Sequence, residues 1–244
     1  MTALLKKEIS SFFSSVTGYL VISVFLITTG LFLWVIPGEF NILYGGYSTL
    51  EPLFYLAPWI YLFLVPAVTM RLFADEKRSG TLELLLVRPL TTYQIIWAKY
   101  LSAVIVIFLS LIPTFLYFFS VYSLGNPVGN IDTGGTWGSY IGLFLLAAVY
   151  AAIGIFASSV TDNQVIAFIL AILLSFFFYT GFESIASIPA FHSFQNAIIS
   201  LGIDQHYSSI SRGVVDSRDL LYFSSVIALF IIITKTVLDS RQWR

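Results

Sequence analysis

The sequence predicts an all-α membrane protein in which a single domain, residues 1–244, crosses the bilayer six times. Apolar residues make up 58% of the chain and charged residues only 10%, whereas a soluble domain carries about 25% charged residues. Six apolar stretches are each near the roughly 20 residues that a helix needs to cross the hydrocarbon core. The chain has no cysteine, which excludes disulfides, thiolate metal sites and cysteine nucleophiles.

Before the first span, apolar side chains recur at every third or fourth position. These positions are Met1, Leu5, Ile9, Phe12 and Val16. Lys6, Lys7 and Glu8 fall beside this stripe, as expected of a helix lying in the headgroup region. A plain extension of the first span would fit equally well, so both alternatives stay open. No small-residue cleavage site ends a short apolar core, so we expect no cleaved signal peptide.

The first three spans are expected at residues 18–36, 53–70 and 97–122. Pro37 closes the first, and a polar turn leads to Pro52, which suits a helix start because its missing N–H costs nothing there. Pro58 and Pro66 lie inside the second span, where they could act as static kinks or as hinges. The third span is long enough to need a tilt or a kink, which Pro113 can supply.

The last three spans are expected at residues 137–160, 165–182 and 220–237. A stripe of small residues runs along the fourth: Gly138, Gly142, Ala147, Ala151 and Gly154. Such a stripe allows close helix contact, either within one chain or between two subunits. The loop 183–219 is too polar to cross in full but contains apolar pieces, which predicts short helices that enter the membrane part-way. Asp216 and Asp219 can cap the sixth span.

The segment 71–99 concentrates charge between the second and third spans. It holds five of the chain's 12 basic residues, namely Arg71, Lys77, Arg78, Arg88 and Lys99, together with Asp75, Glu76 and Glu83. A membrane protein with its charge gathered in this way usually presents that segment to a soluble partner. An ordinary amphipathic loop helix on a membrane surface is the alternative.

Within this segment, the residues Ser79, Gly80 and Thr81 favour a helix start. Glu83 then falls in the first turn, where the positive end of the peptide dipoles favours a carboxylate. Three leucines, Leu82, Leu85 and Leu86, give this short helix an apolar side, and Pro89 ends it. Thr91 and Gln94 fit a capping box, so a second helix should begin there.

These residues resemble the E-x-x-x-G-T-L-E-x-L-L … P … K signature of ABC-2 type transporter permeases. The matching positions are Glu76, Gly80 to Leu85, Pro89, Thr92 and Lys99, with Ala98 where many relatives have glycine. In that family the segment is a cytoplasmic coupling helix that docks into an ATPase subunit, and short re-entrant helices precede the last span. A wider match, including residues 209–223 and the closing residues 241–243, resembles the permease of the gliding-motility-associated ABC transporter.

The resemblance implies two copies of an ABC ATPase subunit and a second permease, identical or homologous, as partners in the bilayer. The implied ATPase contacts are Asp75, Glu76, Lys77, Arg78, Ser79, Gly80, Thr81, Leu82, Glu83, Leu85 and Leu86. Charged residues among them would make polar contacts, and Gly80 would allow close backbone approach. Leu82 and Leu85 would fill an apolar slot of the ATPase.

Basic residues predict the orientation. If both termini share a face with segment 71–99, that face holds ten of the 12 Lys and Arg, and only Arg212 and Arg218 lie opposite. The positive-inside rule then makes that face cytoplasmic. We therefore expect an inner-membrane protein with both termini in the cytoplasm and an external loop at residues 183–219.

Several chemistries are missing from the sequence. No G-x-x-x-x-G-K-[ST] occurs, so the chain has no phosphate cradle and is expected to be neither an ATPase nor another enzyme. A net charge of −1 gives no reason to expect nucleic acid. His192 and His206, with Asp204 and Glu183 nearby, match no metal-ligand spacing, so no metal or other cofactor is expected.

The span interiors indicate what could be transported. Ionisable residues such as Glu51, Glu183 and Lys235 lie near span ends, which disfavours an ion-coupled carrier. The path is expected to be lined by small and aromatic residues, including Tyr55, Trp59, Tyr61, Tyr117 and Tyr179. Such a lining suits an amphiphilic or lipidic cargo. The resemblance implies that this unidentified cargo is exported by ATP hydrolysis in a separate subunit. The alternative is a membrane anchor or scaffold of a motility or secretion machine that carries no cargo.

Overall fold

The structure is a computed structural model that describes residues 1–86, 89–213 and 215–242, with the side chains of Leu84, Leu86, Arg241 and Gln242 left undescribed. The predictions that concern Arg88, Trp243 and the Leu86 side chain therefore lie outside the described part. Every regular element within it is a helix. Six helices are long and apolar enough to cross a membrane: Val16–Val35, Glu51–Arg78, Thr92–Leu124, Thr133–Val160, Gln164–Ala186 and Ser217–Ser240. The predicted six-span, all-α fold is confirmed.

The N-terminal helix α1 (Thr2–Ser14) is separate from the first span, because Ser15 is extended before α2 begins. The alternative of a plain extension of the first span is therefore wrong. The buried positions of α1 are Leu4, Glu8 and Phe12, whereas the predicted stripe placed Glu8 to the side. α1 packs against α7 (Thr92–Leu111), so the protein body covers the face that carries Glu8.

Between the first two spans lies a short helix that the sequence did not predict. α2 (Val16–Gly30) continues as a π-helical turn (Leu31–Val35), and α3 (Ile42–Gly45) follows in the expected polar turn. The Asn41 side chain caps α3 by accepting a 2.9 Å hydrogen bond from the Leu43 N–H. α4 (Glu51–Thr69) has proline in its first turn, as predicted, and runs on through Pro58 and Pro66.

The third span is interrupted where proline was expected to bend it. α7 gives way to a 3-10 turn (Ile112–Thr114) that contains Pro113, and α8 (Phe115–Leu124) continues the span. The predicted capping box is also present. Thr91 Oγ1 accepts from the Gln94 N–H at 3.3 Å, and Gln94 Oε1 accepts from the Thr91 N–H at 3.1 Å.

Replacing Thr91 with alanine is expected to lower the free energy of unfolding by about 1 kcal/mol, because it removes the side-chain acceptor at the start of α7. Thermal or chemical unfolding in detergent measures the loss. Ser123→Ala is a suitable control, since Ser123 is exposed and donates only to the carbonyl of Ser120 within its own helix. If Thr91→Ala and Ser123→Ala lower the free energy of unfolding equally, the capping role of Thr91 is contradicted.

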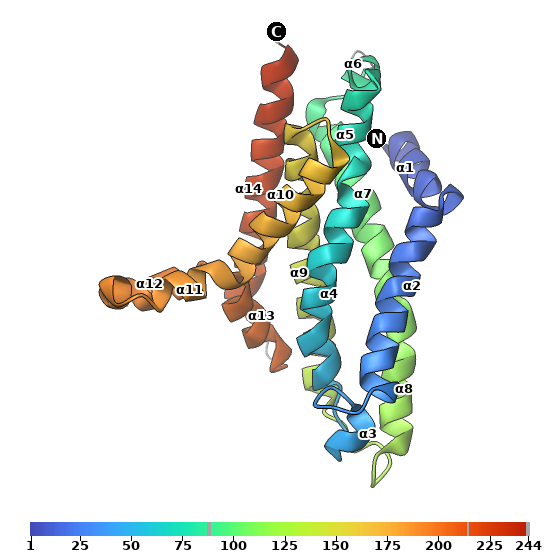
Figure 1. Ribbon diagram of the computed structural model, residues 1–244, viewed down its shortest axis with the longest axis vertical. Coiled ribbons are helices and arrows are strands. Elements are labelled where there is room, and N and C mark those ends of the chain that lie inside the picture. The colour runs from blue at the N-terminus through green and yellow to red at the C-terminus, as the bar shows by residue number, and fades with distance from the viewer. Residues whose placement is uncertain (87–88, 214, 243–244) are drawn as a thin grey trace.

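Helix α9 (Thr133–Val160) is the centre of the bundle (Figure 1). It contacts α4, α7, α10 (Gln164–Phe176), α13 (Ile203–Ser211) and α14 (Ser217–Gln242). Its small residues face neighbours in the same chain. A Cβ on Gly138 would lie 2.8 Å from the Ile210 carbonyl oxygen, and one on Gly154 would overlap Thr69. Ala147 and Ala151 are fully buried. The interpretation of the stripe as packing within one chain is confirmed for these positions.

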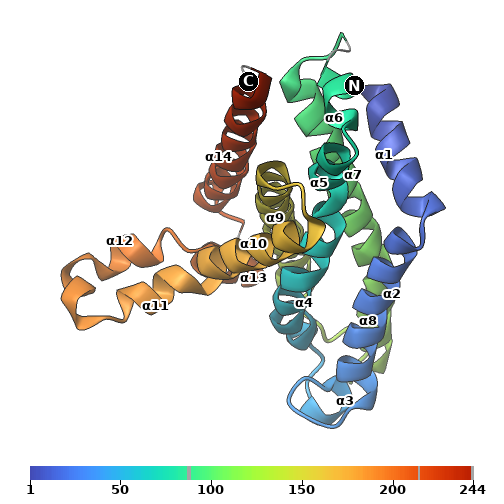
Figure 2. The ribbon, with the colours of Figure 1, turned by 45° about the horizontal axis from the view of Figure 1, so that its top comes forward.

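The short helices expected between the last two spans are present. After α10 (Gln164–Phe176) and a π-helical turn (Phe177–Gly181), the chain forms α11 (Phe182–Ala186), a 3-10 turn (Pro189–Phe194), α12 (Gln195–Ile199) and α13 (Ile203–Ser211). Figures 1 and 2 show α11 and α12 as a hairpin that projects sideways from the bundle. α13 returns to pack on α9. How deeply these helices enter a bilayer stays a prediction.

The last helix, α14 (Ser217–Gln242), is capped by only one of the two expected residues. Asp216 Oδ1 accepts from the Arg218 N–H at 3.0 Å, as predicted. Asp219 instead points inward, is 5% exposed and pairs with His206, so its capping role was wrong. α14 ends at the same end of the molecule as the N-terminus and α6 (Thr81–Leu86) (Figure 1).

Candidate functional site

The predicted contact segment forms an elbow at one end of the bundle. α5 (Arg71–Arg78) follows α4 after one residue, Met70, and the six-residue α6 begins at Thr81 after a turn, so the short helix forms where predicted. Gly80 in that turn has φ +69°, a left-handed conformation that favours glycine. A Cβ there would meet nothing within 4 Å. Within this chain the backbone conformation, and not crowding, requires the glycine.

The joint between α4 and α5 is held by one serine of α9. Ser158 Oγ accepts hydrogen bonds from the Phe73 and Ala74 N–H groups, both at 3.0 Å, and donates to the Met70 carbonyl at 2.7 Å. Ser158 is fully buried. A side chain that inserts into the backbone hydrogen-bond ladder interrupts a helix, which explains why α4 ends at this point.

The elbow is tied to α1 and α7 by a buried ion cluster. The Lys99 ammonium of α7 lies 2.9 Å from Glu76 Oε1 of α5 and 3.2 Å from Glu8 Oε1 of α1. Lys99 is 1% exposed, and a buried ammonium of this kind is tolerated only when carboxylates compensate its lost hydration. We call Glu8, Glu76 and Lys99 the Lys99 cluster. It joins three helices that are distant in sequence.

The surroundings of the Lys99 cluster are polar and not fully packed. A cavity of about 170 Å³ borders the cluster and Arg71. The Arg71 guanidinium donates to Thr17 Oγ1 at 2.9 Å and lies 4.6 Å from the centre of the Phe12 ring. Lys7 lies 3.8 Å from Glu76 Oε1, while Glu76 Oε2 has no hydrogen-bond partner among the described residues. Two lysines thus share the two carboxylates of the cluster.

Several of the predicted ATPase contacts have partners inside the chain. Glu76 belongs to the Lys99 cluster, Asp75 accepts a hydrogen bond from the Gln164 side chain, and Lys77 donates to the Ser159 carbonyl. Leu82 and Leu85 are 6% and 8% exposed and belong to the chain's own core. A role in filling a slot of another protein does not fit that burial.

The remaining predicted contacts form an exposed surface. Its members are Arg78, Ser79, Gly80, Thr81 and Glu83, and we call them the elbow tip. Glu83 lies in the first turn of α6, as predicted. Ser79 Oγ and Thr81 Oγ1 lie 2.9 Å apart and fix the turn between the two helices. The elbow tip is the part of the segment that a soluble partner could reach.

Sequence reasoning missed Glu8 and Ser158. The spacing of Glu8 could have revealed it, because it stands four residues from both Leu4 and Phe12 and therefore on the same helix face. Nothing in the local sequence distinguishes Ser158 from Ser159, because its role depends on a helix joint more than 80 residues away.

Only three of the five aromatic residues expected along a path lie together. Tyr55, Trp59 and Tyr179 line one cavity of about 1160 Å³. Tyr61 is instead buried with its hydroxyl 2.9 Å from Ser110 Oγ, and Tyr117 donates to the Leu26 carbonyl at 3.3 Å. Tyr61 and Tyr117 therefore do not line this cavity.

His206 pairs with an acidic residue other than Asp204 and Glu183, the two nearby in the sequence. His206 Nδ1 lies 2.7 Å from Asp219 Oδ1, and Nε2 lies 3.0 Å from the Ser200 carbonyl oxygen. The imidazole also stacks on Tyr222, with ring centres 3.9 Å apart. Both ring nitrogens therefore lie within hydrogen-bond distance of an oxygen atom. Among the described residues, no group of three or more His, Asp or Glu side chains could hold a metal ion.

Comparison with known proteins adds one finding. A family model described as "ABC-2 family transporter protein" matches residues 3–238, nearly the whole chain. The comparison with curated proteins gives no match.

Proposed function

Because this chain belongs to the ABC-2 family of transporter proteins, we propose that it is the permease subunit of an ATP-driven exporter. It is a multi-pass membrane protein with six spanning helices. ATP hydrolysis would take place in a separate ABC ATPase, because the chain has no phosphate-binding motif. Two ATPase copies and a second permease, identical or homologous, would complete the transporter.

The observation that carries this proposal is that the elbow tip is exposed while the Lys99 cluster beneath it is buried. The tip stands at the end of two long helices, α4–α5 and α7, and the Lys99 cluster fixes α5 to α7. Pressure on the tip would therefore move both helices together. Closure of an ATPase dimer against the tip would in this way reach the membrane-embedded part of the chain.

Glu83→Lys is expected to weaken the complex with the ATPase about tenfold, since reversing one exposed charge at a polar contact costs on the order of 1.4 kcal/mol. Co-purification of the ATPase with the tagged chain at several salt concentrations measures the loss. Glu39→Lys makes the same charge change at an exposed residue of the opposite end and should leave the complex intact. A Glu83→Lys chain that retains a fully active ATPase would contradict the proposed contact.

We propose that the elbow tip and both termini face the cytoplasm, with the protein in the inner membrane. The chain lacks cysteine, so single cysteines can test this directly. Ser79→Cys and Ser208→Cys both fall on exposed residues. In intact cells an impermeant maleimide should label Cys at position 208 and not at position 79, and permeabilisation should expose both. Labelling of position 79 from outside would reverse the orientation.

A transport assay distinguishes a permease that exports cargo from an anchor that carries none. Inverted vesicles that contain the complex should move cargo only when ATP is hydrolysed, whereas an anchor would hydrolyse ATP with no coupled movement. We further propose a role in gliding motility, on the resemblance of residues 209–223 and 241–243 to gliding-associated permeases. Loss of surface spreading after deletion of the gene, with growth unchanged, tests that role.

A further inference from the structure

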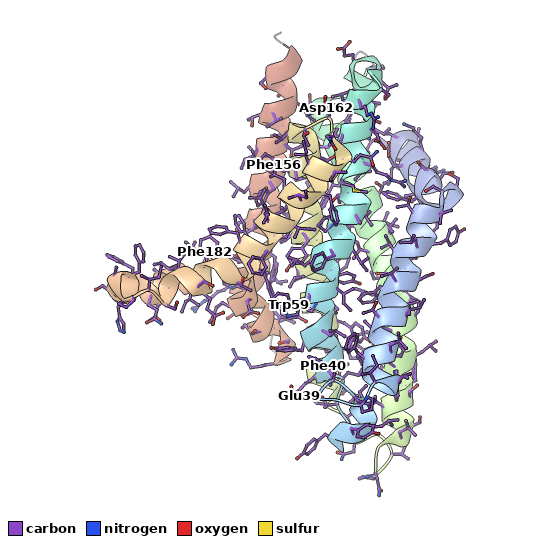
Figure 3. The ribbon with its side chains drawn as sticks, viewed as in Figure 1. Glu39, Phe40, Trp59, Phe156, Asp162 and Phe182 are labelled. Carbon is purple, nitrogen blue, oxygen red and sulfur yellow. The ribbon has the colours of Figure 1, made fainter. Side chains whose placement is uncertain are left out.

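A large cavity lies toward the opposite end of the molecule from the elbow tip. Its walls come from the loop before α4, the first half of α4, the start of α9, the π-helical turn after α10, and α13. Figure 3 shows Glu39 and Phe40 of that loop at the lower end, below Trp59, and Asp162 toward the upper end. The cavity volume of about 1160 Å³ exceeds the roughly 300–1,000 Å³ of common small-molecule sites.

Aromatic rings form one wall of the cavity, where Tyr179 is 7% exposed and Tyr55 and Trp59 are more open. The Trp59 and Tyr179 rings meet edge to face at 5.5 Å, and the Tyr55 ring stacks on Phe40 at 5.9 Å. Tyr55 is 67% exposed and Trp59 38% exposed despite their size. Exposed aromatic faces of this kind attract the apolar body of a ligand and, through the ring quadrupole, a cation.

The charge of the lining is strongly negative. Five carboxylate residues line the cavity, Glu39, Glu51, Asp132, Glu183 and Asp204, against a single basic residue, Arg212. None of these carboxylates has an ion-pair partner in the described part of the chain. This differs from the Lys99 cluster, where two lysines compensate two carboxylates. Among the described residues, the cavity lining therefore carries more carboxylates than basic groups, beside the exposed rings of Tyr55 and Trp59.

Asp204 is the most enclosed of these carboxylates. Burial raises the pKa of Asp204, and the nearby Glu183 raises it further, while a hydrogen bond from Tyr179 lowers it. A positive ligand placed between Asp204 and Glu183 would relieve both unfavourable effects. An anion would add to them, and the described residues contain no group that could hold a bare metal ion.

We propose that this cavity binds an organic cation with an apolar body, held by the carboxylates of Asp204 and Glu183 and by the rings of Tyr55, Trp59 and Tyr179. Its identification as the cargo site rests on the proposed export function, but the binding itself does not. A lipophilic cation with aromatic groups fits each feature of the lining. The apolar body lies on the rings and the charge lies at the carboxylates.

The test compares two ions of the same shape and opposite charge. The full-length chain in nanodiscs is titrated with tetraphenylphosphonium and, separately, with tetraphenylborate, and empty nanodiscs supply the partition background. We expect saturable binding of one cation per chain, weakened by added salt, and no saturable binding of the borate anion. Saturable binding of both ions alike, or of neither, would overturn the proposal.

Variants locate the binding in the cavity. Asp204→Asn combined with Glu183→Gln should weaken cation binding at least tenfold, and Trp59→Leu should weaken it about threefold to thirtyfold. Asp162→Asn also removes one carboxylate, but at an exposed residue toward the other end of the molecule and outside the cavity lining, and it should leave binding unchanged. Because the cavity carboxylates make no ion pair in the described chain, the Asp204 and Glu183 variants should unfold at a temperature no lower than the parent. Undiminished binding in a folded double variant would overturn the proposal.

The outcome can be separated from that of the proposed function. The nanodisc titration needs neither an ATPase nor ATP, so it can succeed even if the chain turns out to be an anchor. Conversely, a chain that supports ATP-driven transport of another cargo but shows no saturable cation binding would refute the cavity proposal alone.

Discussion

Replacing Lys99 with methionine is expected to lower the free energy of unfolding by about 3–5 kcal/mol, the usual effect of removing one partner from a buried ion pair. Methionine keeps most of the side-chain volume, so the loss would come from charge and not from a cavity. The Glu76 and Glu8 carboxylates would lose a donor at 2.9 and 3.2 Å and would repel each other in a buried site. Unfolding of the purified chain in mixed micelles measures the effect.

Lys235→Met is the matched control for this prediction. Lys235 pairs with Asp239 one turn away on α14 at 3.5 Å, with both side chains more than 30% exposed. Its ammonium also lies 4.8 Å from the centre of the Tyr93 ring, so its loss should cost about 1 kcal/mol. Adding Glu8→Gln and Glu76→Gln to Lys99→Met removes the uncompensated charges and should restore much of the stability. If Lys99→Met unfolds like Lys235→Met, the cluster does not stabilise the elbow.

Ser158→Ala is expected to cost at least about 2 kcal/mol, because each buried polar group left without a partner costs roughly 1–3 kcal/mol and Ser158 serves three. Without the Ser158 hydroxyl, the Phe73 and Ala74 N–H groups would lose a hydrogen-bond acceptor and the Met70 carbonyl would lose a hydrogen-bond donor. Amide hydrogen exchange should also rise at Phe73 and Ala74, which places the damage at the α4–α5 joint.

The neighbouring Ser159→Ala is the control. Ser159 is as deeply buried as Ser158, but its hydroxyl donates only to the Phe156 carbonyl of the same helix. Its removal should therefore change stability by well under 1 kcal/mol and leave exchange at the joint unaltered. Similar losses in both variants would mean that Ser158 fills space and does not hold the joint.

The helices of this protein could be predicted because their signals are local. Apolar runs of sufficient length marked all six spans, Pro113 marked the interruption of the third, and Thr91 with Gln94 marked the start of α7. Asp219 shows the limit of such signals, since its position suits a cap and only the tertiary position of His206 turns it inward. The short helix α3 was missed because its four residues lie in a segment with strong turn signals.

The candidate site was predicted in position but not in its division of roles. Residues 81–86 form the expected short helix, yet the sequence could not separate the exposed residues of the segment from those that pack against the bundle. The sequence suggests that Asp75 and Glu76 are exposed. They turn inward because their partners, Gln164 and Lys99, lie on other helices. The cavity could not be foreseen either, because its walls come from five segments between residues 39 and 212.

The helix Glu51–Arg78 runs the whole way between the two sites. It spans 28 residues, about 42 Å at a rise of 1.5 Å per residue. Glu51, Tyr55 and Trp59 border the cavity at one end, and Arg78 belongs to the elbow tip at the other. The joint held by Ser158 lies between these two ends. If occupancy of the cavity alters the affinity of the tip for its partner, reciprocity requires that partner to alter the affinity of the cavity by the same factor.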